Sequence, residues 1–145
     1  MSSDRRPKAS RRATAIHEAG HAVVAHHFGH RIISIRLRKD RTGYVRREQE
    51  GIPCPVEWAL ICLAGDAAEY RARTLPRRLM SRGDSRNMER AGFGRRAVLG
   101  ILRPEADKLM RKLWPRVVRL AKNLESRTWP VTLYGSTLST ALEAP

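Results

Sequence analysis

The chain has 145 residues, of which 41% are hydrophobic, enough for one domain with one buried core. Its formal net charge is +15, from 24 Arg and only 5 Lys against 14 acidic residues, which favours contact with nucleic acid, anionic lipid or an acidic protein. The composition excludes a membrane span and a disulfide scaffold, because no run of residues is apolar enough and there are two cysteines without a C-x-x-C pair. We therefore expect a cytoplasmic protein in which Cys54 and Cys62 are buried, reduced thiols.

The N-terminal region divides into an arm and a helix. Residues 1–9 are predicted to form a disordered basic arm, and residues 10–145 a single domain. The domain begins with a helix from about Ser10 to Phe28 that ends near Gly29. The apolar stripe of this helix consists of Ile16, Gly20, Val23, Val24 and Phe28.

The pattern H-E-x-x-H lies on this helix, as His17, Glu18 and His21. Positions i and i+4 are about 40° apart on a helix, so the two histidines can bind one metal ion. Glu18 then lies close enough to the open coordination position to take a proton from an activated water. The pattern predicts a Zn²⁺ site with Glu18 as general base. The small residues Ala19 and Gly20 predict a close approach of another element.

The other three histidines are expected to play no part in that site. His26, His27 and His30 project to other sides of a regular helix. We interpret them as the solvated C-terminal end of the helix, where partial positive charge is favourable.

A two-residue period follows the first helix. Ile33, Ile35 and Leu37 alternate with polar residues, and Tyr44 and Val45 follow a turn, so residues 33–45 are predicted to form a β-hairpin. Helical periods then return over residues 56–73, 85–99, 104–126 and 135–142. Gly92 and Gly94 weaken the second of these helices, and Pro115 should kink or break the third. The fold class is therefore mainly α (α+β), a compact helical domain with a small β-hairpin, and the H-E-x-x-H pattern on its first helix is typical of a zincin-like peptidase domain.

A catalytic zinc site needs a third protein ligand, with water in the fourth position. The third histidine of the pattern H-E-x-x-H-x-x-G-x-x-H is absent, which excludes a metzincin. Glu57 and Glu69, on the next predicted helix, are available as a ligand of the thermolysin type. Gly65 on that helix indicates a close helix crossing.

The order of these motifs resembles the peptidase domain of the FtsH-type AAA+ zinc metalloproteases. Residues 15–24 resemble its H-E-A-G-H-A signature, residues 63–69 its G-G-R-A-A-E helix, and residues 83–91 its G-A-S-N-D-L segment. The predicted hairpin also occupies the position of two family strands. The resemblance covers about residues 13 to 92 and implies a zinc-dependent endopeptidase that hydrolyses unfolded polypeptide chains.

The sequence departs from the family at the third ligand. The family uses the Asp of G-A-S-N-D, where this chain has Asn87, an uncharged and weaker ligand. Asp84, three residues earlier, shares a helix face with Asn87 if the helix begins early enough. Three outcomes stay open: Asp84 is the ligand, Asn87 coordinates weakly, or the site is degenerate. Glu69 is either a second-shell residue that orients a ligand or an exposed helix acid, and Asp66 is expected to be solvated.

The resemblance also bears on partners. The chain has no G-x-x-x-x-G-K-[ST] loop, so any ATP dependence would come from a separate AAA+ ATPase, and a homo-oligomer is left open. The alternative function is an inactive peptidase-fold adaptor or a basic nucleic-acid-binding module. The net charge of +15 and Asn87 at the ligand position favour this alternative, but few aromatic residues lie among the nine arginines of residues 71–96 to stack on bases, and these arginines also fit a generally basic, solvated surface.

Overall fold

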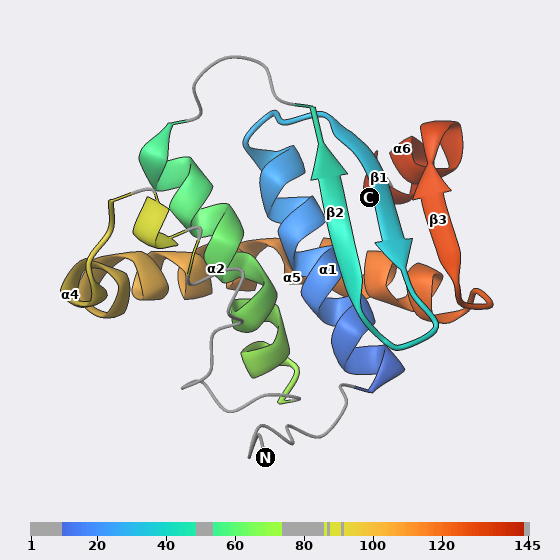
Figure 1. Cartoon of the computed structure of the whole chain (residues 1–145), viewed down its shortest axis with the longest axis horizontal. Coiled ribbons are helices and arrows are strands. Elements are labelled where there is room, and N and C mark those ends of the chain that lie inside the picture. Colours follow the sequence, from blue (N-terminus) through green and yellow to red (C-terminus); the bar gives the residue numbers. More distant parts are fainter. Residues whose placement is uncertain (1–9, 49–53, 74–85, 87, 91, 144–145) are drawn as a thin grey trace.

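A computed structural model of the chain describes residues 10–48, 54–73, 86, 88–90 and 92–143. The predicted N-terminal arm, residues 1–9, lies outside this set. In chain order the elements are α1 (Arg11–His27), β1 (Ile32–Leu37), β2 (Gly43–Arg47), α2 (Pro55–Arg71), α4 (Arg95–Ala97), the π-helical turn η1 (Val98–Leu102), α5 (Arg103–Glu125), β3 (Val131–Tyr134) and α6 (Gly135–Glu143). Figure 1 shows α1 and α2 side by side, α5 crossing behind both, and the three strands on one side of α1. The predicted fold class, mainly α with a small β element, is confirmed.

Helix α1 has the bounds that the sequence predicts. The Ser10 hydroxyl oxygen accepts a hydrogen bond of 3.0 Å from the backbone N–H of Ala13, which satisfies one of the unpaired donors of the first turn. At the other end the chain leaves the helix through Gly29, which has a φ of +84°. The predicted apolar stripe is buried except for Phe28, which is partly buried against the core.

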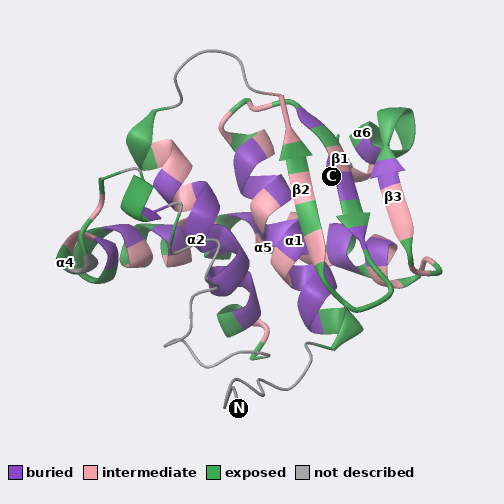
Figure 2. Cartoon of the chain, viewed as in Figure 1, coloured by how far each residue is buried: buried purple, intermediate pink, exposed green. Residues whose placement is uncertain are grey.

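The sheet has one strand more than the predicted hairpin. Its order is β2-β1-β3, and β1 is antiparallel to both neighbours, with Ile35 opposite Val45 and Leu133. Figure 2 shows exposed residues next to buried ones on β1 and alternating with partly buried ones on β2. The buried side packs on α1 and α6. Strand β3 escapes a periodicity analysis because it has four residues, of which only Leu133 is buried.

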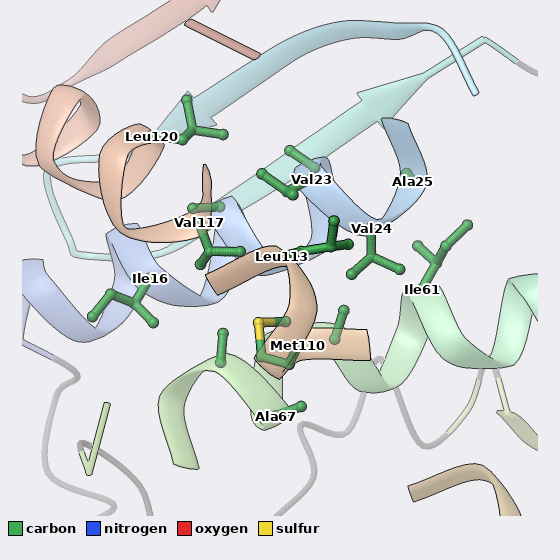
Figure 3. Close-up of a cluster of buried hydrophobic side chains, with 14 of the residues drawn as sticks. Ile16, Val23, Val24, Ala25, Ile61, Ala67, Met110, Leu113, Val117 and Leu120 are labelled. Atoms are coloured by element: carbon green, nitrogen blue, oxygen red, sulfur yellow. The ribbon is translucent and has the colours of Figure 1, made fainter. Parts of the chain in front are cut away.

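The core lies between α1, α2 and α5. Figure 3 shows the side chains of this cluster that carry labels: Ile16, Val23, Val24, Ala25, Ile61, Ala67, Met110, Leu113, Val117 and Leu120. Pro115 does not break α5, which is continuous from Arg103 to Glu125. The predicted break is wrong because Pro115 lies on the exposed side of α5, where a carbonyl without a helical partner faces water.

Two further sequence predictions need correction. The helix predicted over residues 85–99 is not continuous: residues 88–90 are helical, Gly92 has a φ of +83°, and the helix α4 begins only at Arg95. Cys62 is buried as predicted, but Cys54 is exposed, because it precedes Pro55 at the open N-terminal end of α2. Among the described residues, no helix is both long and apolar enough to cross a membrane.

Candidate metal centre

Small residues bring α1 and α2 into close contact. An ideal Cβ on Gly20 would lie 2.7 Å from the carbonyl oxygen of Ala64 and 2.8 Å from the Cβ of Ala68. Real Cβ atoms do not come so close to other atoms, so only glycine permits this separation of the two helices. The close approach that Gly20 predicted is therefore confirmed, and α2 forms one wall of the site beside His17 and His21.

The two histidines of the H-E-x-x-H pattern face one another. Their Nε2 atoms are 3.0 Å apart, and their rings meet edge to face with centroids 4.6 Å apart. Two imidazole ligands of a tetrahedral zinc ion, each about 2.0–2.1 Å from it, have nitrogens about 3.3 Å apart. A shift of a few tenths of an ångström would thus bring the pair to the separation of two zinc ligands.

The opposite nitrogens of the two rings are held by acceptors on α2. His21 Nδ1 lies 2.7 Å from the carbonyl oxygen of Ile61, and His17 Nδ1 lies 3.1 Å from Glu69 Oε2. Because a carbonyl or carboxylate oxygen only accepts, both histidines donate from Nδ1, and a neutral ring then keeps its lone pair on Nε2. The 3.0 Å between the two Nε2 atoms is therefore bridged either by a proton, which makes one ring an imidazolium, or by a cation that both lone pairs bind.

Gly65 leaves room between the histidines. An ideal Cβ on Gly65 would lie 2.5 Å from His17 Nε2 and 2.6 Å from His21 Nε2. The Cβ of any other residue would therefore occupy the space on which the two nitrogens converge. The sequence prediction of a close crossing at Gly65 is confirmed, and the structure adds that the closest atoms belong to the two histidine rings.

Glu18 lies next to the first residue of β2. It is 6% exposed, and its Cγ would lie 3.0 Å from an ideal Cβ on Gly43, the first residue of β2. The turn before β2 is held on α1 by Thr14, whose hydroxyl donates a hydrogen bond of 2.7 Å to the carbonyl of Arg41. This hydrogen bond fixes β2 over the helix turn that carries Glu18.

A second cluster of ligand-type atoms lies on the other side of the His17 ring. His17 Nδ1, one oxygen of Asp66 and one of Glu69 all lie within 4.8 Å of one another. Asp66 is buried, so its predicted solvation is wrong: α2 is covered by α1 and α5 along this turn. Because Glu69 already accepts from Nδ1 and Asp66 is 3.8 Å from it, this cluster fits carboxylates that orient His17 better than a ligand set.

The remaining sequence candidates are placed as follows. Glu69 is buried, which excludes the exposed helix acid that the sequence left open. Glu57 lies 3.7 Å from His30 Nε2. Asp84 and Asn87, the two candidates for the third ligand, lie outside the described residues. The predictions about them stay predictions.

The histidines at the end of α1 differ from the expected solvated, partly charged group. Arg116 donates a hydrogen bond of 2.8 Å to His26 Nδ1, which requires a neutral acceptor nitrogen. Burial, followed by the Arg116 charge, lowers the pKa of His26, and burial, followed by Lys112, lowers that of His27. His27 is exposed, as predicted, but for both residues the lowered pKa opposes the favourable positive charge that the helix end predicted, because burial and cations on α5 act against it.

One group of the site could not be predicted from the type of residue that carries it. The acceptor for His21 is the backbone carbonyl of Ile61, and any residue at this position supplies a carbonyl. Only its spacing could have indicated it, because Ile61 precedes Gly65 by one helical turn and shares its face.

The chain was compared with models of known protein families and with curated proteins. No family model matches it. No curated protein is significantly similar to it. The interpretation of the site therefore depends on the geometry and on the motif resemblance.

Proposed function

We propose that the protein is a zinc-dependent metalloendopeptidase that hydrolyses peptide bonds of unfolded polypeptide chains. The proposal depends on one observation above all: the Nε2 atoms of His17 and His21 face each other at 3.0 Å while both Nδ1 atoms donate to fixed acceptors. This is the donor set of a metal-binding histidine pair, since histidine ligands usually donate their second N–H to a carboxylate or a carbonyl.

His17 and His21 would hold the ion through Nε2, and the carboxylate of Glu69 would orient His17. The third ligand in this proposal is an oxygen of Asp84 or Asn87. A bound zinc ion would supply the Lewis acidity that activates a water and polarises the scissile carbonyl. Glu18 would act as the general base that accepts a proton from the attacking water and as the acid that donates it to the leaving amine. Its burial next to β2 keeps this side chain out of bulk water.

The position of β2 supports a polypeptide substrate. In the three-stranded sheet β2 is an outer strand, and its first residue lies over Glu18. An extended chain that pairs with the outer edge of β2 by main-chain hydrogen bonds would pass beside the proposed base. Main-chain pairing is independent of side chains and therefore suits unfolded substrates of varied sequence.

Metal content tests the first part of the proposal. The purified wild-type protein should bind one equivalent of zinc, measured by elemental analysis after dialysis, and His17→Ala should lose it. His27→Ala is the matched control, because His27 lies on the same helix but is exposed. Zinc that stays bound in His17→Ala would contradict the proposal.

Hydrolysis of a fluorescently labelled unfolded protein tests the second part. Glu18→Gln should retain zinc and abolish hydrolysis, since the amide cannot accept the proton. Zinc affinities of Asp84→Ala and Asn87→Ala, compared with each other, identify the third ligand. A wild-type protein that binds zinc but cleaves no unfolded chain would be a pseudo-enzyme.

A further inference from the structure

The exposed side of the three-stranded sheet carries aromatic and cationic side chains on adjacent strands. We call this surface the outer sheet face. It consists of Ser34 and Arg36 on β1, Tyr44 and Arg46 on β2, and Thr132 and Tyr134 on β3. The strand register places Arg36 between Tyr44 and Thr132, and Ser34 between Arg46 and Tyr134. Tyr44 is therefore directly opposite Arg36, whereas Tyr134 is opposite Ser34, and Arg36 lies two residues further along β1.

The tyrosines are unusually exposed for aromatic residues on a sheet. Tyr44 is 41% exposed and Tyr134 is 68% exposed, whereas their strand neighbours Val45 and Leu133 are partly buried and buried. The Arg38 guanidinium lies 5.0 Å from the centre of the Tyr44 ring. Two ring faces are thus exposed to water, one of them next to a cation, an arrangement that core packing does not require.

The charge of this face has one sign. The three strands contain arginines but no aspartate or glutamate. Two acids lie close to the β3 side of this face, because Glu48 and Glu143 line a pocket together with Ser34, Thr132 and Tyr134. The arginines around Tyr44 therefore form the part of the outer sheet face that attracts anions most strongly.

The two tyrosines are spaced for separate planar groups. They lie on strands that flank β1 and are offset by two residues, so their Cα atoms are about 12 Å apart for ordinary strand spacing and rise. The two rings therefore offer separate stacking surfaces on the two outer strands. A ligand that stacks a planar group on each of them carries at least two such groups, with negative charge where it meets the arginines.

We propose that the outer sheet face binds single-stranded nucleic acid, with one base stacked on Tyr44, another on Tyr134, and the phosphates between them held by Arg36, Arg38 and Arg46. Bases stack on exposed aromatic side chains of sheets, and cationic side chains follow the backbone. Duplex bases are stacked inside the helix and do not reach such rings. This surface lies on the opposite side of the sheet from α1, so the proposal is independent of the metal centre.

An acidic protein partner fits the same charge but not the arrangement of the rings. Protein interfaces are built around a contiguous apolar centre with charges at the rim. On the outer sheet face the reverse holds, because Arg36 and Ser34 separate the two tyrosines. Alternating rings and cations match a polymer in which bases alternate with phosphates.

The test separates stacking from charge, because other basic segments of the chain attract any polyanion. Fluorescence anisotropy compares a labelled oligothymidylate with an abasic strand that has the same number of phosphates. The wild-type protein should bind the base-bearing strand at least about fivefold more tightly. The double variant Tyr44→Ala/Tyr134→Ala should lose this preference, and Tyr44→Phe/Tyr134→Phe should keep it because phenylalanine retains the ring.

Further variants complete the test. Arg36→Gln should weaken binding of both strands and reduce the salt dependence by about 0.7 of a logarithmic unit per decade, the value for one phosphate contact of a single strand. Arg111→Gln, an exposed arginine on α5, and Tyr70→Ala on α2 are matched controls that should keep the preference. His17→Ala should keep it too, which distinguishes this proposal from the metallopeptidase. Equal wild-type affinity for the two strands, or tighter binding of polyglutamate than of oligothymidylate, would overturn the proposal.

Discussion

Two pairs of histidines use Nδ1 in opposite ways: His17 and His21 in the middle of α1, and His26 and His30 at and just after its C-terminal end. His17 and His21 donate from Nδ1 to Glu69 and to the carbonyl of Ile61. Nδ1 of His26 and His30 instead accepts from Arg116 and Arg47. In a neutral ring the lone pair is therefore on Nε2 in the first pair, and Nε2 carries the hydrogen in the second. The identity of the Nδ1 partner, and not the clustering of histidines in sequence, distinguishes candidate ligands from structural residues.

The largest expected effect is on zinc affinity and comes from filling the space between His17 and His21. Gly65→Ala places a methyl group 2.5–2.6 Å from both Nε2 atoms, so the histidine rings must rotate away from each other. Because side-chain rotation can relieve this contact, we expect the fold to survive and the zinc affinity to fall by about 100-fold or more, the upper end of the range for a disturbed coordination shell. Competition with a chromogenic chelator measures this affinity.

The control for Gly65→Ala is Gly94→Ala. An ideal Cβ on Gly94 meets no atom within 4 Å, so this variant changes backbone entropy without touching the histidines. Equal zinc affinity of Gly65→Ala and the wild type would mean that the metal does not lie where the two Nε2 atoms converge.

Removing the negative charge of Glu69, the carboxylate partner of His17, should have a smaller effect on zinc affinity. Glu69→Gln keeps an acceptor for His17 Nδ1 but removes the negative charge, so zinc affinity should fall about tenfold, as for other residues that orient a histidine ligand. Asp66→Asn should change it less, because the Asp66 oxygen is 3.8 Å from the same nitrogen. A larger loss in Asp66→Asn than in Glu69→Gln would instead favour a metal bound on the Nδ1 side of His17, with Asp66 as a ligand.

The helix crossing that supports the first pair can be tested through stability. Gly20→Ala introduces a Cβ only 2.7 Å from a backbone oxygen of α2, which cannot rotate away. The two helices must separate, and we expect the free energy of unfolding to fall by about 1–3 kcal/mol, as for other overpacked cores. Urea denaturation measures the change. Gly100→Ala, where an ideal Cβ meets no atom within 4 Å, should not lower stability.

The sequence predicted the helix bounds of α1, the pairing of His17 with His21, and the close crossing at Gly20 and Gly65, because each depends on helical periodicity and residue size. It missed strand β3, whose four residues have a single buried side chain, and it missed the Ile61 carbonyl, which every residue type supplies. It also assigned positive charge to His26. That assignment depended on the helix dipole alone, whereas Arg116 comes from 90 residues later in the chain.

The smallest expected effect is on the pH dependence of folding stability, and it follows from the lowered pKa of His26. Burial and the Arg116 charge favour the neutral ring in the folded state, although Glu143 acts in the opposite direction. As pH falls below the ordinary histidine value of 6.5, the unfolded chain binds a proton before folded His26 does, so folding stability decreases until the folded pKa is passed.

His26→Gln should therefore flatten the pH dependence of urea unfolding below pH 6.5, because glutamine does not titrate but its oxygen still accepts from Arg116. His27 contributes in the same direction, since its pKa is also lowered, so the double variant His26→Gln/His27→Gln should be flatter still. Above pH 6.5, where His26 and His27 are increasingly neutral in the folded and the unfolded state, the pH dependence of unfolding should become the same for the wild type and both variants. If the free energy of unfolding of His26→Gln depends on pH as steeply as that of the wild type, Arg116 and burial do not hold the His26 ring neutral. The contrast with His17 and His21 would then be wrong for His26.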